Sequence, residues 1–173
     1  TPGTKLVCLN ERFERPGVVE VRFGTPIREI CEELGGGLRD GREIKALQIG
    51  GPLGGILPGW KLDTPFEFDE LAAEGCMVGH GGIVAFDDRT DMRSLAKHLL
   101  HFGASESCGK CFPCRIGLFR GLEMVSADAP VDRAKLEELL ETLEVASLCA
   151  HGGGMPAPIR SLIAHFPDEL GLA

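Results

Sequence analysis

The chain has 173 residues, 43% of them hydrophobic, and a formal net charge of −8. This hydrophobic content is sufficient for a buried core in one domain or in two small ones. Nucleic-acid binding requires a concentrated basic face, and the 18 scattered Lys and Arg residues argue against it. No run of 18 apolar residues and no signal-peptide pattern occurs, which predicts a cytoplasmic chain without membrane contact.

The N-terminus predicts a fragment of a longer polypeptide. Thr1 stands where an initiator Met would be expected, and an apolar, strand-like segment begins already at residue 5. We therefore expect further polypeptide upstream.

The first half alternates short strand-like and helix-like segments. Thr25 and Pro26 offer an N-cap and a first turn for a helix at residues 27–34, and a second short helix is predicted at residues 68–73. Runs of β-branched and apolar residues between turn residues predict four strands, at residues 5–9, 18–23, 44–49 and 82–86. Together these segments predict a mixed sheet that packs around one helix.

A glycine-rich segment interrupts this half of the chain. Residues 50–59 hold five glycines and two prolines, which predicts a long loop. The segment lacks the Lys-Ser/Thr pair of a P-loop and the GxGxxG spacing, so a structural turn is a better interpretation than a phosphate site.

In the second half the apolar period changes to that of helices. Apolar residues recur at helical spacing after Asp91, after Asp132, after Pro156 and directly after a cysteine cluster. Four short amphipathic helices predict a small four-helix bundle. With a boundary at residues 87–89, we predict an α+β protein with a sheet domain at residues 1–86 and a helical bundle at residues 87–173.

Four cysteines form a candidate cluster site. Cys108, Cys111 and Cys114 lie at steps of three in a loop between two predicted helices, and Cys149 follows the third helix. A cubane cluster needs one thiolate on each of four irons, and a loop bent by Gly and Pro can supply three of them. We therefore predict that these four cysteines bind one 4Fe–4S cluster and that the chain transfers electrons.

A four-cysteine zinc site is the chief alternative, because it also uses four thiolates. Zinc sites more often pair two CxxC segments, so three evenly spaced cysteines and one distant cysteine favour iron–sulfur. The odd total of seven cysteines argues against a disulfide framework. Cys8, Cys31 and Cys76 have no partner at ligand spacing and are predicted to be small core residues.

The residues around the cysteines extend the candidate site. His151 lies two residues after Cys149 and precedes three glycines, where backbone amides could approach a cofactor; a flexible loop is an equal alternative. Lys110 and Arg115 place positive charge beside the cluster, which should raise its reduction potential. The other four histidines lack a metal-binding pattern and are predicted to be ordinary surface or hydrogen-bonded residues.

The motif ESCGKCFPCRIG at residues 106–117, followed by SLCA at residues 147–150, resembles the C-terminal part of the NADH-oxidising flavoprotein family, which includes the NADH-binding subunit of respiratory complex I. Residues 16–21 and 50–55 resemble that family's soluble-ligand-binding (SLBB) β-grasp domain, a ubiquitin-like fold. Residues 50–60 and 79–86 most resemble the β subunit of soluble NAD-dependent formate dehydrogenases, and the diaphorase subunit of NAD-linked hydrogenases is close behind.

The resemblance implies an FMN that exchanges a hydride with NADH or NAD and single electrons with the cluster. The family's FMN- and NADH-binding domain would lie upstream of Thr1, so this chain alone should not turn over NADH. The family brings the stretch after its fourth cysteine near the flavin, which corresponds to Ala150 and His151, although a less polar residue often stands at the position of His151.

The partners implied by the resemblance are other subunits of the same oxidoreductase complex. These are a γ subunit, a thioredoxin-like protein with a 2Fe–2S cluster, and the catalytic α subunit.

An alternative of another class is a binding module in which the first domain captures a small ligand and zinc staples the bundle. The first half offers no convergent charged or aromatic constellation, so we expect it to be a spacer and docking domain. Colour separates the two hypotheses, because an iron–sulfur protein is brown and zinc is colourless.

Overall fold

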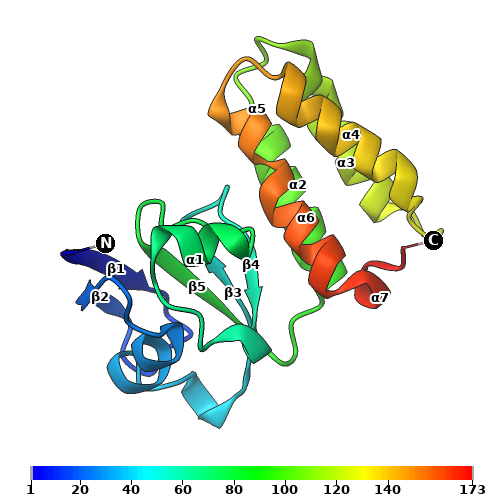
Figure 1. Ribbon diagram of the computed structural model, residues 1–173. Coiled ribbons are helices and arrows are strands. Elements are labelled where there is room, and N and C mark those ends of the chain that lie inside the picture. The colour runs from blue at the N-terminus through cyan, green and yellow to red at the C-terminus, as the bar shows by residue number, and fades with distance from the viewer. Residues whose placement is uncertain (1, 173) are drawn as a thin grey trace. The chain divides into compact units, whose positions relative to one another are not determined.

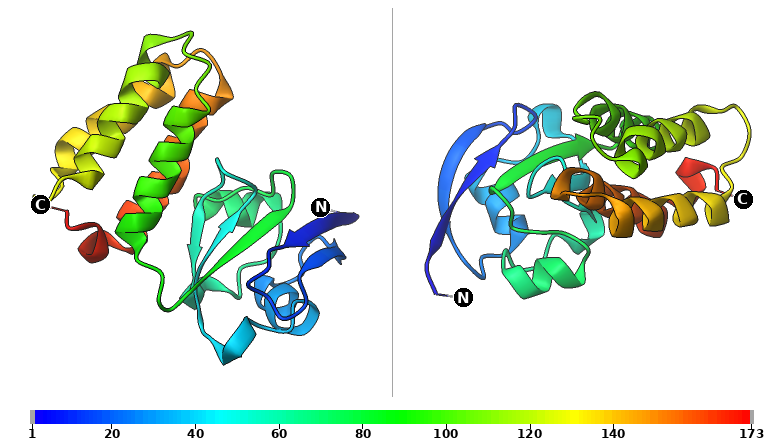
Figure 2. Two further views of the ribbon diagram at one scale, coloured as in Figure 1. Left: turned by 180° about the vertical axis from the view of Figure 1, so that it is seen from behind. Right: turned by 90° about the horizontal axis from the view of Figure 1, so that it is seen from above.

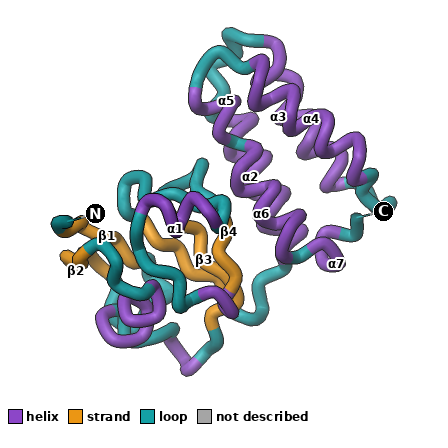
Figure 3. Tube along the Cα trace, in the orientation of Figure 1, coloured by secondary structure: helices purple, strands orange, loops and turns teal. Residues whose placement is uncertain are grey.

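The computed structural model describes residues 2–172 and divides into two compact units, one ending at Thr90 and the other beginning at Asp91. The strands lie in the first unit, and the second is helical (Figure 3). The first unit ends at Thr90 rather than at residue 86, because the carboxylate at the end of the last strand binds the residues that follow. Asp87 accepts hydrogen bonds from the backbone and side chain of Arg89 and from the hydroxyl of Thr90.

The first unit is built on a mixed five-stranded sheet with the strand order β2-β1-β5-β3-β4 (Figure 1). Strand β1 pairs antiparallel with β2 and parallel with β5, whereas β3 pairs antiparallel with both β5 and β4. The strands are β1 Thr4–Leu9, β2 Gly17–Arg22, β3 Ile44–Ile49, β4 Ile56–Pro58 and β5 Gly82–Asp87.

The core of this unit follows the two-residue period of its strands. Val7 and Leu9 of β1 are buried against one apolar cluster, which also contains Phe13 and Phe66. Cys8 lies between Val7 and Leu9 and is exposed. The prediction that Cys8 is a core residue is therefore wrong, because successive strand side chains point to opposite faces.

The first predicted helix forms as a wide turn rather than a regular α-helix. Most of it is the π-helix η1 at Glu29–Leu34. The predicted cap by Thr25 is wrong, because the N–H groups of Ile27 and Arg28 donate instead to the carbonyls of Thr64 and Leu62. Gly35 closes the turn, since its N–H donates to the Ile30 carbonyl five residues back at 2.9 Å. Three further short helices complete the unit: η2 Arg39–Gly41, η3 Gly59–Lys61 and α1 Phe68–Ala73.

The glycine-rich segment at residues 50–59 contains a strand, which corrects the prediction of a continuous loop. Ile56 and Leu57 are fully buried, and β4 pairs with β3. A side chain at Gly55 would stand 2.0 Å from the Gly75 carbonyl oxygen, so only glycine permits this approach of two backbones. The sequence pattern did not predict this strand, because the strand is only three residues long and follows glycines.

The second unit holds four longer helices that contact one another in a ring, α2 to α3, α3 to α4, α4 to α6 and α6 to α2. Asp91 and Asp132 cap α2 and α4, because their carboxylates accept hydrogen bonds from the backbone N–H groups of Ser94 and Lys135. The helices are α2 Met92–Ser105, α3 Phe112–Ser126, α4 Arg133–Ala146, α5 Ala150–Gly154, α6 Pro156–His165 and α7 Pro167–Leu170. Within residues 2–172, no helix has the length and apolar character needed to cross a membrane.

Candidate metal centre

The three closely spaced cysteines lie where the chain turns from α2 into α3. Cys108 is in the connecting loop, Cys111 is the residue that precedes α3, and Cys114 is in the first turn of that helix. Gly109 has a φ of +73°, a left-handed conformation that glycine adopts without strain. The loop can therefore turn sharply between the first two cysteines.

The fourth cysteine is brought to this loop by the short helix α5. Cys149 is the residue immediately before α5. A Cβ placed on Gly152 would stand 2.8 Å from the Cβ of Cys114, so α5 packs directly on the first turn of α3. In Figure 1 and in both views of Figure 2, α5 and the α2–α3 loop lie at the same end of the helical unit.

His151 gives α5 a second attachment. Its Nε2 lies 2.8 Å from the carbonyl oxygen of Gly103, near the end of α2. The equal alternative of a flexible loop is therefore wrong for residues 150–154, which form a helix held against both α2 and α3. No strong helical signal marks this segment in the sequence, since three of its five residues are glycine.

The thiols of Cys111 and Cys114 have different electrostatic surroundings. Hydrogen bonds from the backbone of Leu148, and then of Cys114, lower the pKa of the Cys111 thiol. Burial raises the pKa of the Cys114 thiol, the hydrogen bond with Ser107 opposes this, and the charges of Cys111, Cys149 and Cys108 raise the pKa further. The loop before α3 and the segment after α4 thus meet at one site.

One side of this site is buried and the other is open. Cys114 is buried, whereas Cys108 and Cys149 are exposed. Two large apolar side chains beside the cysteines are also strongly exposed, Phe112 at 69% and Leu148 at 76%. A group held by the four thiols would therefore have an accessible edge bordered by apolar surface.

Two serines that the sequence analysis did not single out belong to the site. The hydroxyl of Ser107 lies 3.2 Å from the Sγ of Cys114. The Oγ of Ser147 is buried and has no hydrogen-bond partner within residues 2–172. A buried hydroxyl without a partner is costly, so this atom fits a site completed by a further group with acceptor atoms. The only feature of the sequence that could have pointed to these serines is that each lies within two residues of a predicted ligand.

The two basic residues of the motif are placed differently from each other. The side chain of Arg115 approaches Gly109, with its Cδ 3.7 Å from the position of a Cβ there. Lys110 is exposed in the loop between Cys108 and Cys111. Both cations therefore lie in the cysteine loop or in the first turn of α3.

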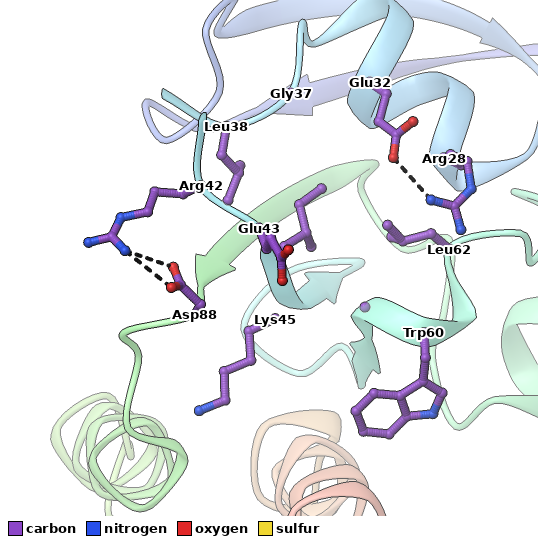
Figure 4. A pocket seen from close by; sticks show the side chains of 12 residues that line it. Arg28, Glu32, Gly37, Leu38, Arg42, Glu43, Lys45, Trp60, Leu62 and Asp88 are labelled. Atoms are coloured by element: carbon purple, nitrogen blue, oxygen red, sulfur yellow. Dashed lines mark hydrogen bonds and ion pairs between the residues drawn. The ribbon is translucent and has the colours of Figure 1, made fainter. Parts of the chain in front are cut away.

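A pocket in the first unit offers a separate candidate site. The pocket has a volume of about 690 Å³ and combines Trp60 with several charged side chains (Figure 4). Arg28 pairs with Glu32 and Arg42 pairs with Asp88. These two pairs take up four of the six charged side chains that line the pocket; of the other two, Glu43 and Lys45, the lysine donates to the Thr90 carbonyl.

Comparisons with known proteins support the iron–sulfur interpretation of the second unit. Residues 94–172 match the family described as the NADH-ubiquinone oxidoreductase-F iron–sulfur binding region. The chain is 38% identical over 172 residues to the NADP-reducing hydrogenase subunit HndC of Solidesulfovibrio fructosivorans, covering 96% of this chain and 35% of the relative. It is 39% identical over 173 residues to the NADH-quinone oxidoreductase F protein of Escherichia coli (strain K12), covering 96% of this chain and 39% of the relative.

The fold is also similar to a solved structure. A chain of an NAD+-reducing NiFe-hydrogenase in the H2-reduced state superposes with a TM-score of 0.84 at 29% identity, covering 99% of this chain and 30% of that one. The chain thus spans between 30% and 39% of the length of these relatives. The second unit matches the iron–sulfur binding region of the NADH-ubiquinone oxidoreductase-F family. The cofactor of that region is a 4Fe–4S cluster.

Proposed function

We propose that the chain is the electron-relay portion of an NAD(P)H-linked oxidoreductase subunit, with a 4Fe–4S cluster held by Cys108, Cys111, Cys114 and Cys149. The observation that carries this proposal is the approach of α5 to the first turn of α3, because it delivers the distant Cys149 to the loop that holds the other three cysteines. A 4Fe–4S cluster supplies single-electron transfer when it is bound.

The spacing of the four cysteines along the sequence favours a cluster over a single zinc ion. In a tetrahedral zinc site, bonds of about 2.3 Å hold four sulfurs within about 4 Å of one another. Within residues 2–172, no three His, Cys, Asp or Glu side chains form a group that could hold one metal ion, so the cluster proposal is supported by the cysteine spacing and by the family match of residues 94–172. A cubane places each thiolate on a separate iron and so accepts thiols that are spread further apart.

The open edge of the site supports a role in relay. Cys108 and Cys149 are exposed beside Phe112 and Leu148, so a redox partner can approach the cluster without unfolding the helical unit. We propose that the partners are iron–sulfur subunits of the same complex, including a thioredoxin-like γ subunit with a 2Fe–2S cluster and a catalytic α subunit.

Hydride exchange with NAD(H) belongs, in this proposal, to an FMN bound outside the chain. The relatives reported above are more than twice as long as this chain, which leaves room for a flavin domain elsewhere in such a polypeptide. Ala150 and His151 are the residues that we propose lie toward the flavin. His151 is suited to this because its Nε2 is engaged at the Gly103 carbonyl, which fixes the ring.

We propose that the complex is of the NAD-linked hydrogenase or complex I type. The relatives reported above are hydrogenase and NADH-quinone oxidoreductase proteins, and they favour these types over the formate dehydrogenase β subunit suggested by residues 50–60 and 79–86.

For the first unit we propose an SLBB-type β-grasp domain that acts as a spacer and docking element. Strand β5 lies between β1 and β3 and runs parallel to β1, which is the strand arrangement that supports this assignment. In the second unit, the ring of four longer helices supports the assignment of a four-helix bundle.

Elemental analysis and electron paramagnetic resonance (EPR) test the proposal. The chain, purified without exposure to oxygen, should contain about four irons and four sulfides per molecule, and dithionite should give a reduced-cluster EPR signal. It should show no NADH-dependent dye reduction, because hydride exchange requires a flavin. A colourless protein with one zinc ion would contradict the relay function and favour the zinc-stapled binding module.

A further inference from the structure

The hydroxyl of Ser107 is held in a geometry suited to hydrogen-bond donation. Its Oγ accepts a hydrogen bond from the backbone N–H of Gly109 at 3.3 Å and lies 3.2 Å from the Sγ of Cys114. Because the amide occupies a lone pair of the oxygen, the hydroxyl proton remains for the sulfur. A thiolate bound to iron has no proton, so Ser107 must be the donor in that state.

Ser147 is a second hydroxyl at the same place. Its buried Oγ has no partner within residues 2–172. The position of a Cβ on Gly152 lies 2.4 Å from this Oγ and 2.8 Å from the Cβ of Cys114, so the serine and the cysteine flank the same glycine. Since the absence of a side chain at residue 152 keeps these groups close, Ser147 is available as a donor on the Cys114 side of the site.

Hydrogen bonds to the sulfurs of an iron–sulfur cluster favour its more negative, reduced state and so raise its reduction potential. We propose that Ser107 and Ser147 are positioning residues of this kind, which donate hydrogen bonds to cluster sulfurs on the Cys114 side and raise the potential. This inference rests on the cluster assignment made above. Lys110 and Arg115 act in the same direction through charge, but they are exposed and are screened by solvent.

The test is an EPR-monitored redox titration of the full 173-residue chain loaded with iron and sulfide. Ser107→Ala should lower the equilibrium constant for one-electron reduction about tenfold, which corresponds to a shift of about 59 mV to lower potential. Ser147→Ala should shift the potential in the same direction. Ser107→Thr, which keeps a hydroxyl, should titrate close to wild type, and so should Ser105→Ala, which removes an exposed hydroxyl two residues away.

A second readout detects the hydrogen bond itself. The Fe–S(Cys) stretching bands in the resonance Raman spectrum should shift between H2O and D2O for wild type, and this shift should be smaller for Ser107→Ala. A Ser107→Ala protein that keeps four irons and titrates at the wild-type potential would overturn the inference.

If Ser107→Ala assembles no cluster, the other two variants decide. A lowered potential in Ser147→Ala with a wild-type potential in Ser107→Thr supports the inference, whereas a wild-type potential in Ser147→Ala overturns it. Failure of the wild-type chain to bind a cluster would instead count against the proposed function, so the two failures are distinguishable.

Discussion

The two units of this chain use cysteine in opposite ways. In the first unit, Cys31 and Cys76 are packed in the apolar core, and burial raises the pKa of each thiol to about 12. In the second unit, Cys108 and Cys149 are exposed and backbone hydrogen bonds lower the pKa of Cys111, whereas Cys114 is buried and has a raised pKa. A thiol in apolar surroundings stays protonated and inert, whereas a thiol near backbone N–H groups is suited to metal ligation.

The comparison also separates two sources of stability. The first unit is held by one apolar cluster in which Phe13, Ile27 and Phe66 are fully buried. At the end of the second unit that carries the cysteines, the fully buried Met155 packs on Gly103, and His151 and Ser107 make polar contacts. The group that the thiols bind would add to these contacts. We therefore expect core substitutions to act on the first unit and substitutions around the cysteines to act on cluster occupancy.

The largest effect should come from Phe13→Ala. Removing a fully buried ring should cost about 3–5 kcal/mol of unfolding free energy. Denaturant unfolding followed by the fluorescence of Trp60, the single tryptophan, reports on this unit. Phe68→Ala is the matched control in the same unit, because Phe68 is 50% exposed on α1 and its loss should cost no more than about 1 kcal/mol. Loss of the cluster in Phe13→Ala would contradict the expectation that core substitutions in the first unit leave cluster occupancy unchanged.

A smaller effect is expected for Gly152→Ala, which adds a methyl group between Ser147 and Cys114. The new Cβ would stand 2.4 Å from the Ser147 Oγ, so α5 must move away from α3, at a cost of about 1–3 kcal/mol. The iron content should fall because Cys149 moves with α5.

Gly153→Ala is the control for that substitution. Its Cβ would meet only the Glu144 carbonyl oxygen, at 3.4 Å, and its iron content should stay at the wild-type value. Equal iron contents in the two variants would mean that the approach of α5 does not position the ligand.

The smallest effect is a pH dependence confined to the first unit. Hydrogen bonds from the Arg89 side chain lower the pKa of the buried Asp87 carboxyl. A lowered folded-state pKa gives stability that is present above the unfolded value of about 3.9 and is lost as the pH falls through the folded value. Asp87→Asn should therefore cost roughly 1 kcal/mol at pH 7 and nothing well below pH 4.

Urea unfolding of wild type and Asp87→Asn between pH 2 and pH 7 measures this difference. Asp128→Asn, an exposed substitution in the loop after α3, should leave the unfolding midpoint unchanged. A constant gap between wild type and Asp87→Asn at every pH would rule out the carboxylate as its cause.

Much of this architecture could be predicted from local pattern. The strand at Ile44–Ile49 and the helix at Phe68–Ala73 have the predicted bounds, because apolar runs and turn residues mark them clearly. The helical spacing after Asp91 and after Asp132 also predicted helices that form there. These features depend on residues that are close together in the sequence, so the local sequence pattern is sufficient to predict them.

The features that escaped prediction depend on contacts distant in sequence. Strand β4 exists because Gly55 admits the backbone of Gly75, and the helix α5 exists because Gly152 admits Ser147 and Cys114. The wide turn of η1 depends on the N–H of Gly35 reaching Ile30. The four ligand candidates could be predicted from spacing, but the serines that surround them became visible only when the helices were placed.

The central claim is that Cys149 is a cluster ligand and that Cys31 is a core residue. Cys149→Ala removes the thiolate of one iron, so the reconstituted protein should hold three irons or fewer and lose the wild-type EPR signal after reduction. Cys31→Ala should keep four irons and the wild-type signal, and should lose about 1 kcal/mol of stability from core packing. Four irons and an unchanged signal in Cys149→Ala, together with their loss in Cys31→Ala, would contradict the account.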